Sequence, residues 1–440
     1  MKDNKSISLS CIKDNRVKKR NEFREIIQEF ILSPLPEIVM RGMELPLDVP
    51  KIVSLLGPRR AGKTYYLYQL IRQLQLVKKV DRSRLIYVNF EDDRLFPLQL
   101  SDLDDLLQTY YELYPANKAK KVWFFFDEIQ EVSSWEKFVR RVFDRENCRI
   151  YLTGSSSKLL SRELSTTLRG RTLPFEVFPL SFEEFLKFNK VAFHKDTPEG
   201  KSVLLHWLDR WLVQGGFPEL VFLPKELHRR TIDEYLDLML YRDLTERFSI
   251  KNPSLLKYLL KYLVSNVANP FSITKTFNDI KSQGYAVSRS TIYDYLSYLE
   301  EAFAVFRINI WHRSVRTQAL RPDKTYIIDP AFKHALTIGE DKGRLLENAV
   351  FLFLRQKGLQ LHYFQQKQEV DFYCENGIPT NVCFEYYTPN TRQREISGML
   401  EALQYLDLEE GLIVTRDQSE IIHQEGKTIK VVPAYAYFLS

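Results

Sequence analysis

The chain has 440 residues with a net charge of +6, 44% hydrophobic residues and 27% charged residues. These values are typical of a folded chain of about two to four domains and exclude collagen-like or low-complexity sequences. No apolar run approaches the roughly 20 residues of a membrane-spanning helix, and the N-terminus lacks the apolar core of a secretory signal. No cysteine pair has C-x-x-C spacing among Cys11, Cys148, Cys374 and Cys383. We therefore expect a reduced, cytoplasmic protein without a membrane partner.

The positive charge is concentrated at the N-terminus. Residues 1–20 contain seven Lys or Arg residues and two Asp residues, so the rest of the chain is almost neutral. We expect a solvated basic arm over 1–20, and contact with phosphates is the alternative. The basicity of the whole chain is therefore weak evidence for nucleic-acid binding.

The first third of the chain alternates apolar strands with helices. Gly62–Val77 and Ser101–Tyr114 have helical patterns, and the Ser101 and Asp104 spacing resembles a capping box. Short strands that are apolar throughout are typical of a parallel sheet buried on both faces. The pattern predicts a doubly wound α/β domain with strands Lys51–Leu56, Leu85–Phe90, Val122–Phe126, Arg149–Thr153 and Leu173–Phe178.

A phosphate-binding loop follows the first strand. Residues 57–64 match G-x-x-x-x-G-K-[ST] in full, between an apolar strand and a helix. Glycines allow the backbone N–H groups to point at phosphate oxygens, and the following helix adds a partial positive charge. We expect Lys63 to reach the β- and γ-phosphates of a nucleotide and Thr64 to ligate Mg²⁺. The predicted nucleotide-binding residues here are Gly57, Pro58, Arg59, Arg60, Ala61, Gly62, Lys63 and Thr64.

Two acids follow the third strand directly. Asp127 is expected to hold Mg²⁺, largely through water, and Glu128 to orient or deprotonate the attacking water. A carboxylate beside the metal-binding acid favours hydrolysis over transfer to another substrate. The alternative is that the pair only caps the next helix.

Polar groups after the fourth strand complete the predicted site. Thr153 or Ser155 is expected to sense the γ-phosphate, and a Gly/Ser turn is the alternative. Arg171 or Arg169 could stabilise charge in the transition state, in cis or toward a neighbouring subunit. The alternative for this pair is a solvated loop.

The second half of the chain begins with helices and contains a helix-turn-helix pattern over residues 272–310. Gly284 is placed at the turn, and Ser288 at the start of the second helix. That helix would expose Arg289, Ser290, Tyr293, Asp294 and Ser297, of which only Arg289 is basic. DNA-reading helices usually carry more positive charge, so a packing or protein-contact module stays open.

These motifs in sequence resemble a known family. GPRRAGKT, FFFDEIQEV, TGSSS, LRGR, PLSFEEF and QGGFPEL are similar to motifs of AAA-type ATPases with a C-terminal domain of unknown function. The resemblance implies ATP, rather than GTP, as the nucleotide. After the basic arm (1–20), it implies an AAA-like P-loop domain (21–180), a helical lid (181–250), a winged helix (251–320) and a nuclease-like α/β domain (321–440).

The last of these domains resembles the core of PD-(D/E)xK nucleases. Asp371 and Glu385 match the two metal-binding acids of that core, and Glu347 matches its helix acid. Tyr387 stands at the lysine position, and a neutral phenol cannot supply an ammonium charge. Lys367 could substitute, but we expect a nuclease fold without nuclease activity.

The sequence thus predicts a Mg²⁺-dependent AAA-type ATPase that acts as a nucleotide-driven switch for its C-terminal modules. The alternatives are an ATP-gated DNA-binding protein with little turnover and an ATP-regulated, metal-dependent nuclease. ATP is the expected partner, while DNA, a protein partner and a homo-oligomer stay open.

Overall fold

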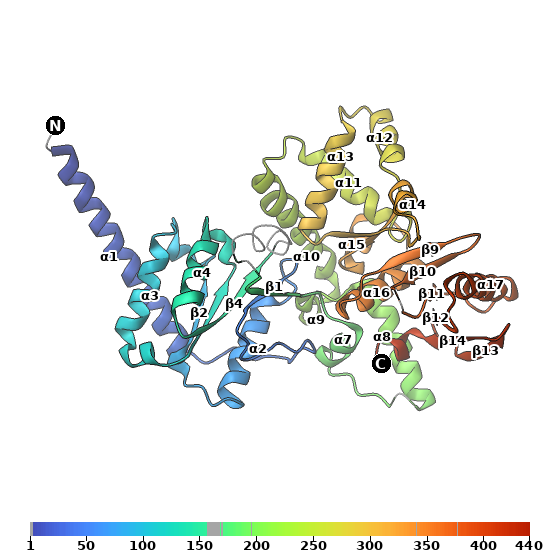
Figure 1. Ribbon diagram of the computed structural model, residues 1–440, viewed down its shortest axis with the longest axis horizontal. Helices are drawn as coiled ribbons and strands as arrows, with labels where there is room; N and C mark the ends of the chain where they lie inside the picture. Colours follow the sequence, from blue (N-terminus) through green and yellow to red (C-terminus); the bar gives the residue numbers. More distant parts are fainter. Residues whose placement is uncertain (1–2, 156–167, 169, 195, 340, 376) are drawn as a thin grey trace. The chain divides into compact units, whose positions relative to one another are not determined.

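The computed structural model describes residues 3–155, 168, 170–194, 196–339, 341–375 and 377–440, with side chains from residue 16 onward. The chain forms two compact units (Figure 1). The first unit contains Met1–Pro58 and Gly62–Val177, and the second contains Arg59–Ala61 and Phe178–Ser440. Each unit is described by itself below.

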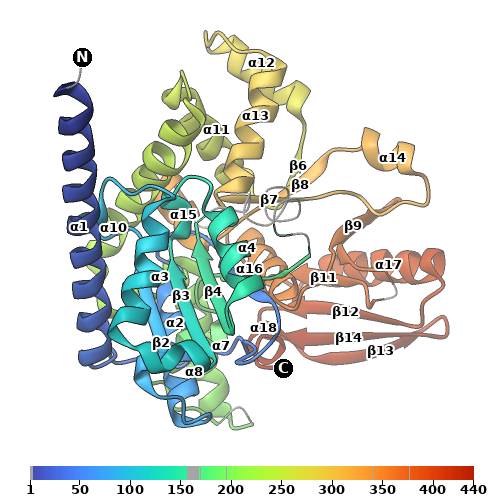
Figure 2. The ribbon, with the colours of Figure 1, turned by 60° about the vertical axis from the view of Figure 1, so that its left-hand side comes forward.

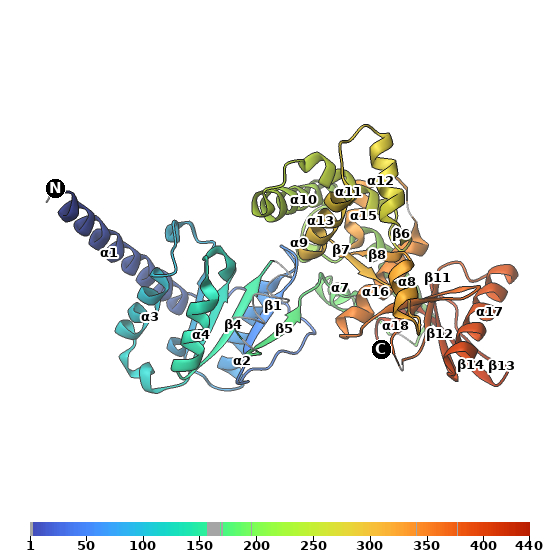
Figure 3. The ribbon, with the colours of Figure 1, turned by 45° about the horizontal axis from the view of Figure 1, so that its top comes forward.

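A five-stranded parallel sheet forms the centre of the first unit. Its strand order is β2-β3-β4-β1-β5, and every neighbouring pair is parallel. Figure 3 shows β1 between β4 and β5. All five strands expected from the sequence are confirmed, with bounds β1 Ile52–Leu56, β2 Leu85–Asn89, β3 Val122–Asp127, β4 Cys148–Gly154 and β5 Thr172–Glu176.

Helices connect these strands and bury their apolar faces. With this strand order, the usual right-handed crossovers put α2 on one face of the sheet and α3 and α4 on the other. Ser101 makes no side-chain cap bond at the start of α3, so the capping box expected there is wrong. The elements are α2 Lys63–Leu76, α3 Asp102–Leu113, α4 Trp135–Arg145 and the short helices η1 Arg82–Arg84, η2 Asp93–Leu95, η3 Pro115–Ala119 and η4 Ile129–Glu131.

The expected basic arm is the first part of a longer helix. Helix α1 spans Asp3–Leu32 and therefore continues across the boundary expected at residue 20. Arg16 Nε lies 2.9 Å from the Asp105 carboxylate of α3, and Lys19 Nζ donates to the Leu95 carbonyl at 2.6 Å. These basic side chains therefore bind the first unit itself.

The second unit begins with a group of helices. Helix α7 starts in a capping box between Ser181 and Glu184. Pro253 begins a new helix after the π-helix η5. The helices are α7 Phe182–Phe188, α8 Pro198–Gln214, α9 Pro218–Phe222, α10 Lys225–Leu238, the π-helix η5 Met239–Glu246 and α11 Pro253–Ser265.

A small antiparallel sheet of order β6-β8-β7 lies beside two helices at the positions expected for the helix-turn-helix. The Ser288 hydroxyl caps the second helix by accepting from Thr291 N at 3.1 Å. A long loop containing α14 joins β7 to β8. The bounds are β6 Pro270–Phe271, α12 Ile273–Ser282, α13 Arg289–Glu301, β7 Val305–Ile308, α14 Val315–Leu320 and β8 Asp323–Ile327.

A six-stranded mixed sheet of order β13-β14-β12-β11-β10-β9 completes the second unit. Figure 2 shows β11, β12, β14 and β13 side by side, and α17 packs on this sheet through Met399 and Leu403. No helix of the described residues is long and apolar enough to cross a membrane. The remaining elements are α15 Pro330–Leu336, α16 Lys342–Gln356, β9 His362–Gln365, β10 Glu369–Tyr373, β11 Thr380–Cys383, α17 Pro389–Leu406, β12 Glu410–Thr415, β13 Glu420–Gln424, β14 Lys427–Pro433 and α18 Ala434–Tyr437.

Candidate nucleotide-binding site

The loop between β1 and α2 has the backbone that its glycines permit. Gly62 has φ of 95°, a left-handed conformation that costs glycine little. A Cβ on Gly57 would lie 2.1 Å from the Val177 carbonyl oxygen, so only glycine fits this close approach. The loop therefore depends on both glycines of the motif.

Lys63 is buried at the centre of this loop, with only 4% of its surface exposed. Its Nζ donates to the carbonyl oxygens of Gly57 and Pro58, each at 3.1 Å. The same atom lies 3.3 Å from Glu128 Oε1. The structure thus brings the loop lysine and the predicted catalytic carboxylate together.

Asp127 ends β3 and accepts three hydroxyl hydrogen bonds. Its Oδ2 accepts from Thr64 Oγ1 at 2.7 Å and from Tyr87 OH at 2.8 Å, and its Oδ1 accepts from Thr153. Burial and the adjacent Glu128 charge raise the pKa of Asp127, while the three hydroxyls oppose that rise. The hydroxyls therefore favour the charged carboxylate in a buried position.

Glu128 is held beside Asp127 by an unusual backbone. Its φ is 52°, in the left-handed region that few residues other than glycine adopt. Its N–H donates to Thr153 Oγ1 at 2.8 Å, and Gln130 Nε2 donates to its Oε2 at 2.6 Å. Thr153 thus contacts both acids at once.

The strand order explains this convergence. Strand β4 lies between β1, which leads into the loop, and β3, which ends in Asp127. The carboxyl end of β4 therefore delivers Thr153 between the two halves of the site. Ser155 is also buried, but none of the described hydrogen bonds joins it to Asp127 or Lys63.

Tyr87 is a site residue that sequence reasoning missed. It lies on β2, two residues before Asn89, which pairs with Asp127 across the sheet. Burial raises its pKa, so the phenol stays protonated and donates. Its only sequence signal is a position near the carboxyl end of a strand adjacent to β3.

Arg171 lies at the amino ends of the strands, whereas the phosphate loop lies at their carboxyl ends. Its carbonyl accepts from Ile52 N at 2.8 Å, where β1 begins, whereas the loop follows the end of β1. The five residues of β1 span about 16 Å between its amino and carboxyl ends. Its Nε donates to Asp144 at 2.9 Å, and none of the described contacts joins it to Lys63 or Glu128, which favours the alternative that it acts toward a neighbouring subunit. Arg169 lies outside the described residues.

The donors at this site fit Mg²⁺ and a nucleotide. Thr64 and Asp127 offer hydroxyl and carboxylate oxygens, the ligands that Mg²⁺ prefers. When bound, Mg²⁺ neutralises negative charge on the phosphates. Among the described residues, no group of three or more His, Cys, Asp or Glu side chains could hold a metal ion by itself.

A buried charge cluster in the second unit contains two of the acids predicted from the nuclease resemblance, Glu347 and Asp371. Lys324 Nζ on β8 lies 2.8 Å from Glu347 Oε1, 2.8 Å from Glu369 Oε1 and 2.9 Å from Asp371 Oδ1. Lys324 is only 1% exposed. Its ammonium therefore occupies the position between carboxylates that a metal would need.

None of the described contacts joins the two predicted metal-binding acids, Asp371 and Glu385. Asp371 does lie beside Glu347, but Glu385 is exposed and follows the end of β11. The residue facing Asp371 is Asn381, whose Oδ1 accepts from Asp371 N at 3.2 Å. The match of Glu385 to the second metal-binding acid therefore stays a prediction. The exposed Tyr387 and Lys367 do not join this cluster in the described contacts.

Burial shapes the charges of this cluster. It raises the pKa of Glu347 to about 8, and the charge of Asp371 adds to the rise. Lys324 opposes that rise, and Tyr326 OH donates to Glu347 Oε1 at 2.8 Å. Burial lowers the pKa of Lys324, but its acidic neighbours together raise it by more, so the net pKa lies above the usual value and Lys324 remains a cation.

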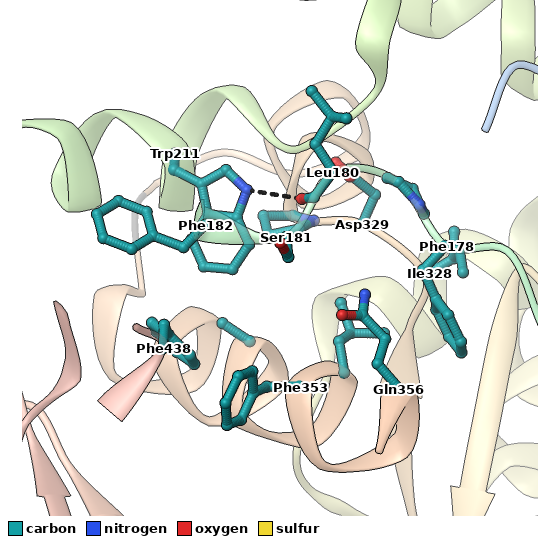
Figure 4. A pocket seen from close by; sticks show the side chains of 14 residues that line it. Phe178, Leu180, Ser181, Phe182, Trp211, Ile328, Asp329, Phe353, Gln356 and Phe438 are labelled. Atoms are coloured by element: carbon teal, nitrogen blue, oxygen red, sulfur yellow. Dashed lines mark hydrogen bonds between the residues drawn. The ribbon is translucent and has the colours of Figure 1, made fainter. Parts of the chain in front are cut away.

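A cavity in the second unit is too small for a nucleotide. Its volume is about 20 Å³, room for about one water molecule. Figure 4 shows Trp211, Phe353 and Phe438 around it, with the Trp211 indole donating to the Leu180 carbonyl at 3.2 Å. Asp329 lies at its edge and accepts from Gly216 N at 2.7 Å. The cavity is therefore a feature of packing near the QGGFPEL motif.

The site and the strand order define a P-loop nucleotide-binding domain of AAA type. Residues 49–186 match the family profile described as AAA domain. Residues 205–342 match a profile described as a domain of unknown function (DUF8612).

The chain also matches two relatives over most of its length. It is 37% identical to an uncharacterized protein of Methanocaldococcus jannaschii, covering 96% of each chain. It is 31% identical to an uncharacterized protein of Haemophilus influenzae, covering 74% of this chain and 79% of the relative. The chain belongs to the family of these proteins, with an AAA domain in its first half.

Similar solved structures include two proteins at low TM-scores. One is the Aeropyrum pernix ORC2 protein, with 12% identity, a TM-score of 0.37, and coverage of 77% of this chain and 94% of that one. The other is the Thermotoga maritima RuvB branch migration motor, with 16% identity, a TM-score of 0.29, and coverage of 64% and 86%.

Proposed function

We propose that the chain is a Mg²⁺-dependent ATPase whose nucleotide state switches its C-terminal modules. The observation that carries this proposal is the contact of two phosphate-loop residues with two acids. Thr64 donates to Asp127, and Lys63 lies beside Glu128. A loop that only capped a helix would not need either carboxylate. ATP rather than GTP rests on the family resemblance.

Each residue has a defined task in this proposal. Lys63 exchanges its contacts with loop carbonyls for the phosphates of the nucleotide. Asp127 and Thr64 hold the metal, and Glu128 orients the attacking water and accepts its proton. Thr153 contacts both acids, so it links occupancy of the phosphate site to the position of Glu128.

Arg171 has a task only between subunits. Because it lies at the sheet edge opposite its own phosphate loop, it could reach only the nucleotide of a second copy. A homo-oligomer in which Arg171 stabilises transition-state charge in trans is therefore part of the proposal.

The alternative of an ATP-regulated nuclease has little support. Lys324 already neutralises the carboxylates that would hold its metal. The alternative of ATP-gated DNA binding with little turnover differs from the main proposal in the rate of hydrolysis alone, so turnover decides between them.

The test is phosphate release from Mg-ATP by the purified protein, alone and with duplex DNA. We expect Lys63→Ala to abolish binding of a fluorescent ATP analogue. Glu128→Gln should keep binding and lose about 10²-fold or more of turnover. Glu44→Gln changes an exposed carboxylate of the same unit and should leave turnover unchanged. Undiminished turnover in Glu128→Gln would remove the role given to that carboxylate.

A further inference from the structure

The loop between β7 and β8 forms a basic extension of the second unit, which we call the arginine arm (residues 309–322). It contains Arg313, Arg316 and Arg321 and neither Asp nor Glu. Figure 2 shows it reaching out beyond β7 and β8, with α14 at its far end. The arm therefore presents one sign of charge.

A single tyrosine fixes both ends of the arm. Trp311 N donates to the Tyr363 carbonyl at 2.6 Å, and Tyr363 N donates to the Asn309 carbonyl at 3.1 Å. The Tyr363 hydroxyl donates to the Pro322 carbonyl at 2.6 Å. The base of the arm is thus anchored to β9, and its outer part extends from a defined position.

The three arginines of the arm are exposed and make none of the ion pairs found among the described residues. Arg307, just before the arm, behaves differently, because it pairs with Glu300 at 2.7 Å and with Asp323 at 3.2 Å. Arg313 lies over the Tyr405 ring at 5.4 Å. The arm also carries two apolar side chains, Val315 and Leu320, that are each 76% exposed. Exposed apolar groups among unpaired arginines are typical of a binding surface.

We propose that the arginine arm binds the phosphate backbone of duplex nucleic acid. Guanidinium groups match phosphates in charge and in hydrogen-bond geometry. Helix α13 lies in the same module, and its exposed face carries Arg289 but also Asp294. The arginine arm supplies the positive charge that helix α13 lacks. A duplex fits better than an acidic protein, because a helix-turn-helix arrangement and a basic arm together match a groove and its flanking phosphates.

The same unit holds the duplex without cutting it. Lys324 follows the arm by two residues, and its ammonium occupies the carboxylate cluster. The proposal therefore names a nucleic-acid partner for the C-terminal modules of the proposed function. It does not depend on ATP hydrolysis, because the binding assay contains no nucleotide and the basal ATPase assay contains no nucleic acid.

The test is fluorescence anisotropy of the full chain with a labelled DNA duplex of about 25 base pairs, from about 50 to 200 mM salt. Binding of an RNA duplex of the same sequence, measured in the same way, shows whether the arm prefers a DNA or an RNA phosphate backbone. The arm variant is Arg313→Ala, Arg316→Ala and Arg321→Ala together. The matched control, with three exposed charges removed elsewhere in the unit, is Lys201→Ala, Lys225→Ala and Arg229→Ala.

We expect the wild-type chain to bind the duplex and the arm variant to bind at least about tenfold more weakly. Three lost phosphate contacts should reduce the slope of log K against log salt by about 2.7. The control should keep both affinity and slope, and the duplex should stay intact with Mg²⁺ or Mn²⁺. No duplex binding by the wild-type chain, or an equal loss in the arm variant and the control, would overturn the proposal. A circular dichroism spectrum and a melting temperature equal to those of the wild-type chain show that the arm variant is folded.

Discussion

Replacing Lys324 by Met tests the buried charge cluster most directly. The substitution leaves Glu347, Glu369 and Asp371 without the ammonium that lies within 2.8–2.9 Å of each. Removing one partner of a buried ion pair costs about 3–5 kcal/mol, since the remaining charge is uncompensated. At about 2–4 °C per kcal/mol, the second unit should melt about 10 °C lower. Lys367→Met, which removes an exposed lysine, is the matched control.

The loss should depend on pH. The native pKa of Glu347 is raised to about 8, above the unfolded value, so its contribution to stability is present at low pH and lost as pH rises through 8. Without Lys324 the native pKa of Glu347 rises further, so the loss of unfolding free energy at neutral pH becomes larger. The difference in unfolding free energy between wild type and variant should therefore shrink as pH falls toward about 5.

Thermal unfolding at several pH values measures this difference. Hydrogen exchange of peptides from α16 and β10 shows whether the change is local to the cluster. A variant as stable as the wild type at neutral pH, or one equally destabilised at pH 5 and pH 8, would refute the reasoning.

Three further predictions follow from the contacts described above. Tyr87→Phe removes one of the three hydroxyl donors to Asp127, and should cost about 2 kcal/mol of stability and weaken Mg²⁺-dependent ATP-analogue binding, measured by denaturation and titration. Gly215→Ala should cost about 3 kcal/mol, because its φ is 80° and a Cβ would lie 1.8 Å from Asp329 Oδ1, whereas Gly426→Ala, with open space around it, should cost about 1 kcal/mol. Burial raises the pKa of Asp329 to about 7, so its contribution to stability is full at low pH and falls by about 4 kcal/mol as pH rises through 7; Asp329→Asn should remove that slope in pH-dependent denaturation.

The sequence was sufficient for the nucleotide site because its signals are local. Strands β1 to β4 are largely apolar runs, and the chemistry stands where a strand ends, as with Asp127 at the end of β3. The order of strands in a doubly wound sheet then brings Lys63 and Thr153 to the same edge. Tyr87 could not be found in this way, because nothing in a strand pattern shows where a phenol hydroxyl points.

The second unit was harder to predict because its decisive contacts are long-range. Lys324 precedes Glu347 by 23 residues and Asp371 by 47, so no motif spacing links them. The resemblance to the nuclease core matches Glu385 to the second acid, but strand β11 ends at Cys383, before Glu385. The side chain that contacts the Asp371 backbone is that of Asn381.

Because both ends of the arginine arm are anchored at Tyr363, the outer part of the arm can contact a partner without taking part in the pairing of the strands. Both ends of the loop are fastened to one residue, so its outer part can change in length or composition while the strands keep their register. Such a loop can be replaced by another loop without disturbing the strands that it joins. Members of one family could acquire different partners by exchanging about a dozen residues, with no change to the nucleotide-binding machinery.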